Sequence, residues 1–209
     1  MAEVDYFYSA HSAYAYLGSA YFMDIAKASG WTIVHKPIDL NRAMASFGST
    51  AFRERSVKQR DYFFRREMER WAEFRGVIMP GRPSNHHHSP DLANRMLIAA
   101  KQAGETVDAL AHRMLEAHWG EGADLADGDV LVGIAGDVDM DGPRWLEAAG
   151  SPEAAREYAA NTDEAIARNV PGSPTYFVDG DMFYGQDHLE LVARAMARPF
   201  KNTWPEITA

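Results

Sequence analysis

Apolar and polar positions near the start of the chain follow two different periods. Residues 4–8 form an apolar, aromatic run that is typical of a buried strand. Residues 12–29 carry apolar side chains at three- and four-residue spacing, which predicts a helix that ends at Gly30. Residues 31–35 predict a second strand, with Pro37 just beyond it. This strand–helix–strand order predicts a βαβ unit with parallel strands.

The pattern changes to helices in the middle of the chain and returns to strands near its end. Residues 43–167 carry no strand signal; amphipathic segments alternate there with turns rich in Gly, Pro and Asp. Residues 175–178 and 182–184 predict a hairpin, because Asp-Gly separates two apolar runs. A final helix is expected over residues 186–197.

This order of elements predicts the domain organisation. Strand–helix–strand, a helical region and then strand–strand–helix is the order of a thioredoxin-like fold with a large all-helical insertion. We therefore expect an α/β protein with a thioredoxin-like domain of residues 1–40 and 168–209 and an insertion of residues 41–167.

Composition and charge exclude several classes of site and partner. The chain has 209 residues, no cysteine and a formal net charge of −9. Disulfides, thiol redox exchange and thiolate metal sites are therefore excluded, and neither nucleic acid nor an anionic membrane is an expected partner. The first residues lack the basic region of a signal peptide, and no apolar run is long enough to span a membrane. We expect a soluble, cytoplasmic protein.

The joint between the first strand and the first helix is the candidate site. The first N–H groups of a helix have no intrahelical acceptor and carry the positive end of the helix dipole. Ser12 at this joint can cap the helix, or it can direct its hydroxyl to an anion bound there. Thioredoxin-like oxidoreductases place Cys-x-x-Cys here, because this field lowers a thiol pKa. We align Ser12 with the attacking cysteine and Ala15 with the resolving one.

Five stretches spread over most of the chain are similar to those of one known family. They are "VDYFYSAHSAYAYL", "RWAEFRGV", "LANRMLIAA", "HWGEGADLAD" and "NVPGSPTYFVDGDMFYGQDHLELV". Through them the chain resembles the 2-hydroxychromene-2-carboxylate isomerases, relatives of kappa-class glutathione transferases and DsbA-like oxidoreductases. The resemblance implies a DsbA-like or kappa-class fold, glutathione as the cofactor and a homodimer.

The resemblance also implies roles for individual residues around the cofactor. The hydroxyl of Ser12 would hydrogen-bond the glutathione sulfur and favour its thiolate. Pro174 would be a cis-proline, so that the backbone of Ser173 pairs with the cysteinyl part of glutathione. Gln186 and Asp187 would bind the γ-glutamyl end, while Asp187 can also cap the last helix.

The expected substrate is a small aromatic carboxylate, an aryl-pyruvate of aromatic catabolism. Family members often carry Lys three residues before a Tyr in the insertion, but Gln59 occupies this place, so Lys58 or Arg60 can hold the carboxylate instead. Asn41 is a further pocket candidate. His11 replaces an apolar residue beside the serine; it can act as an acid, a base or a second donor, or it can cap the helix or face solvent.

The resemblance implies a glutathione-dependent cis–trans isomerisation. The thiolate adds to a conjugated carbon, rotation follows, and elimination returns free glutathione. Tyr14, Phe63 and Trp71 can line the aryl pocket, although most aromatic residues belong to the core. Two alternatives stay open: a kappa-like glutathione transferase or peroxidase, and a non-catalytic thioredoxin-fold binding protein.

A run of three histidines, His86 to His88, lies in a loop between Pro83 and Pro90. Consecutive residues point in different directions, so a run of this kind rarely closes one metal site. We therefore predict no metal here and prefer a histidine that faces the substrate.

Overall fold

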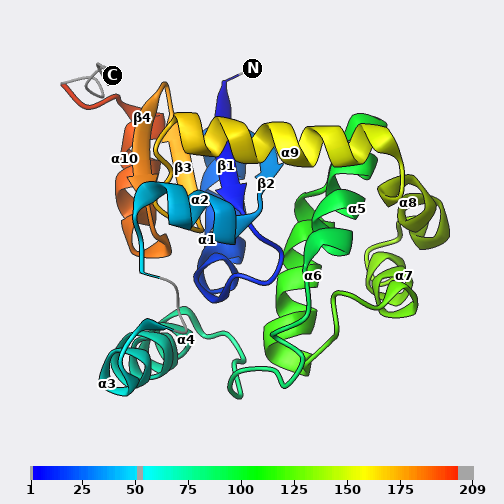
Figure 1. Cartoon of the computed structure of the whole chain (residues 1–209). Coiled ribbons are helices and arrows are strands. Elements are labelled where there is room, and N and C mark those ends of the chain that lie inside the picture. Colours follow the sequence, from blue (N-terminus) through cyan, green and yellow to red (C-terminus); the bar gives the residue numbers. More distant parts are fainter. Residues whose placement is uncertain (1, 51–53, 202–209) are drawn as a thin grey trace.

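A four-stranded mixed sheet lies at the centre of the protein, in the order β2-β1-β3-β4 (Figure 1). The computed structural model describes residues 2–50 and 54–201. The strands are β1 (Glu3–Tyr8), β2 (Thr32–Pro37), β3 (Thr175–Val178) and β4 (Asp181–Tyr184). β1 pairs in parallel with β2 and antiparallel with β3, and β3 pairs antiparallel with β4. The parallel pair confirms the predicted βαβ unit.

The helices follow the predicted order, but the last α-helix begins three residues later than predicted. α1 (Ala13–Ser29) joins β1 to β2, and α10 (Leu189–Ala197) follows β4 after the 3-10 turn η3 (Gln186–His188). The elements between β2 and β3 are α2 (Leu40–Phe47), α3 (Val57–Asp61), the π-helical turn η2 (Tyr62–Arg66), α4 (Glu67–Arg75), α5 (Asp91–Gln102), α6 (Asp108–Glu121), α7 (Gly128–Gly136), α8 (Gly142–Ala149) and α9 (Pro152–Ala167). In the described part of the chain, no helix is long and apolar enough to cross a membrane.

Local chemistry sets the limits of α1. The side chain of Ser12 accepts the N–H of Ala15 at the start, and Gly30 ends the helix in the left-handed region with φ 69°. Pro37, expected just beyond the second strand, is instead the last residue of β2 and pairs in register with Tyr8. A proline fits there because β2 is an edge strand, where the missing N–H costs little.

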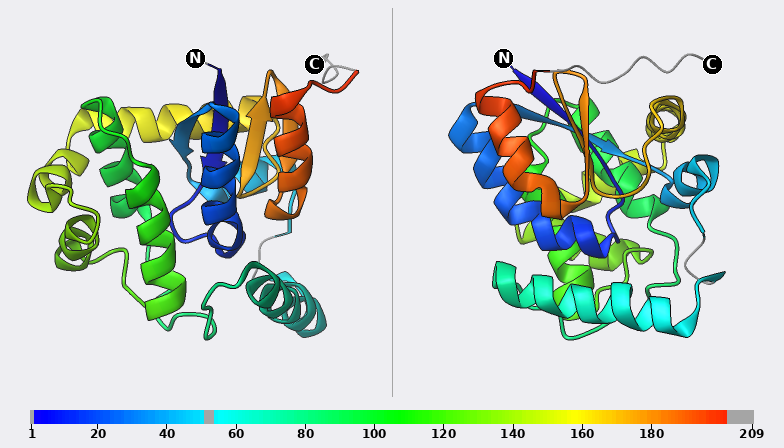
Figure 2. Two further views of the ribbon diagram at one scale, coloured as in Figure 1. Left: turned by 180° about the vertical axis from the view of Figure 1, so that it is seen from behind. Right: turned by 90° about the vertical axis from the view of Figure 1, so that its left-hand side faces the viewer.

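Alternate residues of β1 enter two different apolar cores. Tyr6 and Tyr8 pack in the core that includes residues of α1 and α10, and the rings of Tyr6 and Tyr176 stack at 5.3 Å. Phe7 points to the opposite face, into a smaller core with residues of α2 and α9, where it meets Phe177. Figure 2 shows α1 and α10 together on one face of the sheet. Helices on both faces explain why the consecutive aromatic residues Tyr6, Phe7 and Tyr8 are all buried.

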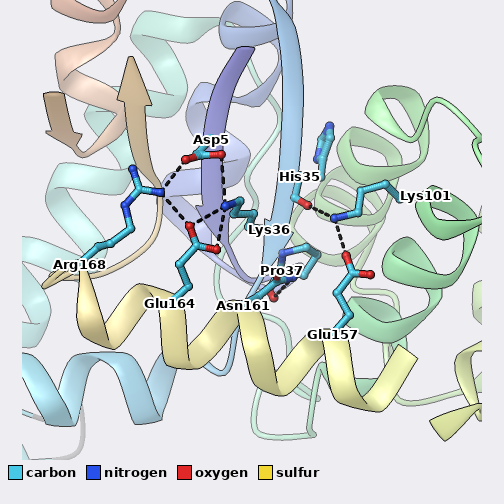
Figure 3. A network of polar contacts seen from close by, with 9 residues as sticks. All are labelled: Asp5, His35, Lys36, Pro37, Lys101, Glu157, Asn161, Glu164 and Arg168. Carbon is cyan, nitrogen blue, oxygen red and sulfur yellow. Dashed lines mark hydrogen bonds and ion pairs between the residues drawn. The ribbon is translucent and has the colours of Figure 1, made fainter. Parts of the chain in front are cut away.

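A network of charged side chains attaches α9 to the sheet (Figure 3). Lys36 of β2 lies 2.6 Å from Glu164 of α9 and 3.3 Å from Asp5 of β1. Arg168, just after α9, contacts the same two carboxylates at 2.8 and 2.6 Å. The network fixes the end of the insertion on the sheet a few residues before β3, and so it helps to position the segment that contains Ser173.

Candidate active site

Ser12 links the start of α1 to the segment before β3. Its Oγ accepts the N–H of Ala15 at 3.3 Å and donates to the carbonyl oxygen of Ser173 at 3.2 Å. The residue is buried, with 6% of its surface exposed. The single hydroxyl proton is thus already used within the protein, and a bound sulfur would have to compete with the Ser173 carbonyl for it.

The peptide bond between Ser173 and Pro174 is cis, as predicted. The hydroxyl of Ser173 accepts the N–H of Ser9 at 3.2 Å, so this segment is tied to both ends of the β1–α1 joint. A Cβ atom on the preceding Gly172 would lie 3.0 Å from the ring and the hydroxyl of Tyr184. Glycine at this position therefore lets Tyr184 of β4 pack against the cis-proline segment.

Asn94 of α5, which the sequence reasoning missed, holds the joint from the insertion. It is fully buried, and its Oδ1 accepts the N–H of Ala10 at 2.9 Å. Its Nδ2 donates to the hydroxyls of Ser9 at 3.3 Å and of Tyr158 at 3.2 Å. The hydroxyl of Tyr158 in turn donates to Asp91 at 3.0 Å. The amide thus uses both of its donors, which fixes its orientation and that of the joint.

Three histidines gather beside the joint, on the side of α6. The ring of His86 lies 5.0 Å from that of His11 and 5.2 Å from that of His118. Burial lowers the pKa of His11 to about 4 and that of His86 to about 3, and the neighbouring histidines act in the same direction. Trp119 donates from Nε1 to the carbonyl oxygen of His11 at 3.0 Å. The cluster is therefore neutral near pH 7.

The other two histidines of the run His86 to His88 lie outside this cluster. His87 and His88 are exposed; His88 contacts Asp124 at 2.6 Å. Among the described residues, no group of three or more His, Asp or Glu side chains is arranged to hold a metal ion.

The aromatic residues expected around the substrate are only partly brought together. The hydroxyl of Tyr14 donates to the backbone oxygen of Phe63, which joins α1 to η2. Burial raises the pKa of Tyr14 to about 12. Trp71 instead packs edge-on against Phe74 at 5.5 Å, and the guanidinium of Arg75 lies 5.4 Å from its ring.

Gln186 and Asp187 lie in the 3-10 turn η3 rather than in the first turn of the last helix. Gln186 is fully buried; its Oε1 and its backbone oxygen both accept from Arg75 of α4 at 3.2 Å. Its Nε2 is buried without a partner among the described residues. Asp187 is half exposed and makes no helix-capping hydrogen bond, so the expected cap is wrong. The clamp by Arg75 was not predicted.

The polar residues proposed for the substrate carboxylate lie on α2 and α3. Lys58 and Asn41 are exposed, and Arg60 donates to the backbone oxygen of Arg55 at 2.6 Å. α4 packs against α1, whereas α3 packs against η2. The roles of these three residues stay predictions.

The fold and the joint define a class of protein. A thioredoxin-like sheet, a capped helix start beside a cis-proline and a helical insertion between β2 and β3 are together the architecture of DsbA-like proteins. Residues 3–197 match the family model of the DSBA-like thioredoxin domain, and the chain belongs to this family.

Relatives in this family carry a more specific name. The chain is 30% identical to a 2-hydroxychromene-2-carboxylate isomerase of Sphingobium xenophagum over 90% of this chain and 95% of the relative. It is 29% identical to the enzyme of the same name from Pseudomonas putida, over 93% and 94% of the two chains. A solved structure of a 2-hydroxychromene-2-carboxylate isomerase matches with a TM-score of 0.76 and 25% identity, over 94% of this chain and 95% of that chain.

Proposed function

We propose that the protein is a glutathione-dependent isomerase of 2-hydroxychromene-2-carboxylate or a related aryl-pyruvate. Similarity over almost the whole length to relatives of that name supports the reaction class. One observation supports glutathione as the cofactor. The joint keeps the helix start and the cis-proline of a fold that binds thiols, yet the chain contains no cysteine. A thiolate at this place has to come from a bound molecule.

The residues at the joint fit a thiol cofactor. Ala13 and Tyr14 occupy the first turn of α1, where backbone N–H groups have no intrahelical acceptor, and both residues are only half-buried. These N–H groups and the hydroxyl of Ser12 would stabilise a sulfur anion, as the helix dipole does. Ser173 would offer its backbone to the cofactor, and the exposed carboxylate of Asp187 would hold an ammonium group. The Nε2 of Gln186, which is buried without a partner among the described residues, is a donor and would bind the carboxylate of the γ-glutamyl end.

Bound glutathione would supply a nucleophile that adds reversibly to a conjugated double bond and so permits rotation about it. The protein's own part is to hold the charge and the substrate. Asn94 keeps the joint in one conformation, because it satisfies the Ala10 N–H and the Ser9 hydroxyl together. Lys58 or Arg60 would neutralise the substrate carboxylate.

The test is a titration of the purified protein with reduced glutathione, followed by an assay of isomerisation. The wild type is compared with Ser12→Ala and with Ser9→Ala, because both hydroxyls lie in the joint and each makes local hydrogen bonds. We expect glutathione to bind and Ser12→Ala to weaken that binding roughly tenfold, as the loss of a hydrogen bond to a charged sulfur implies. We expect Ser9→Ala to weaken binding less than Ser12→Ala does, because it removes a contact within the joint but no contact to the sulfur. If Ser9→Ala weakens glutathione binding more than Ser12→Ala does, Ser9 and not Ser12 contacts the sulfur.

The same assay separates the alternatives. An isomerase needs glutathione but does not consume it, whereas a kappa-like transferase uses one molecule in each turnover. Turnover that persists without glutathione would refute the proposed cofactor. No binding, together with no rise in melting temperature at saturating glutathione, would favour the non-catalytic binding protein.

A further inference from the structure

The protons of the cluster formed by His11, His86 and His118 can be placed from its hydrogen bonds. Nδ1 of His118 lies 2.8 Å from the backbone oxygen of Ala123, which can only accept, so Nδ1 carries the proton and Nε2 is an acceptor. Nδ1 of His86 lies 2.9 Å from this Nε2 and therefore donates to it. A neutral His86 then keeps a free lone pair on its own Nε2.

His11 carries its ring proton on the other nitrogen, Nε2. Asn94 is oriented by the Ala10 N–H that its Oδ1 accepts, so its Nδ2 donates to the hydroxyl of Ser9. The buried hydroxyl needs an acceptor for its own proton, and among the described residues Nδ1 of His11, at 2.9 Å, serves this purpose. Neutral His11 accepts at Nδ1 and carries its proton on Nε2.

The two Nε2 atoms are thus a donor and an acceptor that the protein leaves unmatched. The rings of His11 and His86 are 5.0 Å apart, and within residues 2–50 and 54–201 neither Nε2 atom has a hydrogen-bond partner. Neither atom is one of the fully buried, unpaired polar atoms of this part of the chain, so each keeps some exposed surface. Burial keeps both rings neutral near pH 7.

We propose that His11 and His86 bind the hydroxyl group of the substrate. Nε2–H of His11 donates to the hydroxyl oxygen, and Nε2 of His86 accepts the hydroxyl proton. A hydroxyl both donates and accepts, whereas a carboxylate would leave the His86 lone pair unmatched and an ammonium group would leave the His11 proton unmatched. Trp119 supports the pair, since it donates to the backbone oxygen of His11 and its ring lies 4.9 Å from that of His86.

This inference rests on the proposed function, in which the substrate carries one hydroxyl and one carboxylate. It places the hydroxyl at the histidines next to Ser12 and leaves the carboxylate to the basic residues of the insertion. The orientation of the substrate is then set by neutral hydrogen bonds at one end and by charge at the other.

The first experiment compares two ligands, 2-hydroxychromene-2-carboxylate and the chromene-2-carboxylate that lacks the hydroxyl. Dissociation constants are measured without glutathione, so that no turnover occurs. The wild type should bind the hydroxylated ligand roughly five- to tenfold more tightly, the effect of one or two neutral hydrogen bonds. His86→Phe, which keeps a ring against Trp119, should lose this preference. His87→Phe, at the exposed neighbouring position, should retain it.

A second measurement needs no ligand. Nitrogen-15 NMR of the free protein should find the proton of His11 on Nε2 and those of His86 and His118 on Nδ1. A proton on Nε2 of His86 would overturn the inference and leave the proposed function standing, as would equal affinity of the wild type for both ligands. A preference that survives in His86→Phe would overturn it too. If neither ligand binds, the proposed function fails and the inference fails with it.

Discussion

The partly buried His11 beside the joint should make the protein sensitive to acid. The pKa of His11 is about 4 in the folded protein, chiefly because of burial, with His118 and Arg82 acting in the same direction and Asp91 against it. A histidine in the unfolded chain titrates near pH 6.5. The unfolded state therefore binds the proton first, and stability falls as the pH drops below about 6.5 until the folded state also protonates near pH 4.

The size of this effect follows from the difference between the two pKa values. Between about pH 8 and about pH 5, His11 alone should lower the free energy of unfolding by about 2 kcal/mol. Asparagine at this position removes the titration, while its side-chain oxygen can still accept the Ser9 hydroxyl in place of Nδ1. His11→Asn should thus lose about 2 kcal/mol less than the wild type over this range.

Urea unfolding at the two pH values measures the difference directly. His87→Asn is the matched control, because its side chain is exposed, and it should follow the wild type. If wild type and His11→Asn lose the same free energy between the two pH values, His11 is not held neutral by burial. Its Nδ1 would then not be the unprotonated acceptor of the Ser9 hydroxyl.

Four further substitutions test packing and hydrogen bonds by denaturant unfolding. Gly142→Ala should lower the free energy of unfolding by about 2 kcal/mol, because its Cβ would lie 2.6 Å from a backbone oxygen of α7. Gly133→Ala, at a position of α7 where a Cβ meets no other atom, should instead raise it by about 0.5 kcal/mol. Equal effects of the two substitutions would contradict the packing. Arg75→Lys should cost about 1–2 kcal/mol, because lysine lacks the planar fork that contacts both oxygens of Gln186; an unchanged stability would show that the clamp is not needed. Asn94→Ala should lower the free energy of unfolding by about 2–3 kcal/mol, because it leaves buried groups unpaired, and it should also lower turnover. Full activity of this variant would show that catalysis does not need the joint to be held by Asn94.

Much of the fold could be predicted because its signals are local. Gly30 ends α1 with a positive φ, and Asp179 and Gly180 take the positive φ values of a tight hairpin, 49° and 85°. The apolar period of α1 and the aromatic run of Tyr6 to Tyr8 in β1 were equally visible. Each of these features depends on residues within a few positions of one another, which is the range that a single sequence reports.

The contacts that build the site could not be predicted in this way. Asn94 reaches Ala10 across 84 positions, and Arg75 reaches Gln186 across 111. Hydrophobic periodicity shows which face of a helix is buried, but not which distant polar group its few buried polar side chains will meet. One signal did exist. Asn94, Trp119 and Arg75 all lie in insertion stretches that carry the family resemblance, and each holds the joint or η3.

The order of the sheet has a consequence for how the chain is made. β1 is a central strand, yet its second neighbour, β3, pairs Val178 with Val4, so 174 residues of synthesis separate the two partners. At a typical ribosomal speed this interval lasts roughly 10 to 35 s. Throughout it, one edge of the apolar strand β1 is open to pairing with any other extended chain. The nascent protein is therefore most vulnerable to aggregation before β3 has been synthesised, and slower translation of the insertion would lengthen that period.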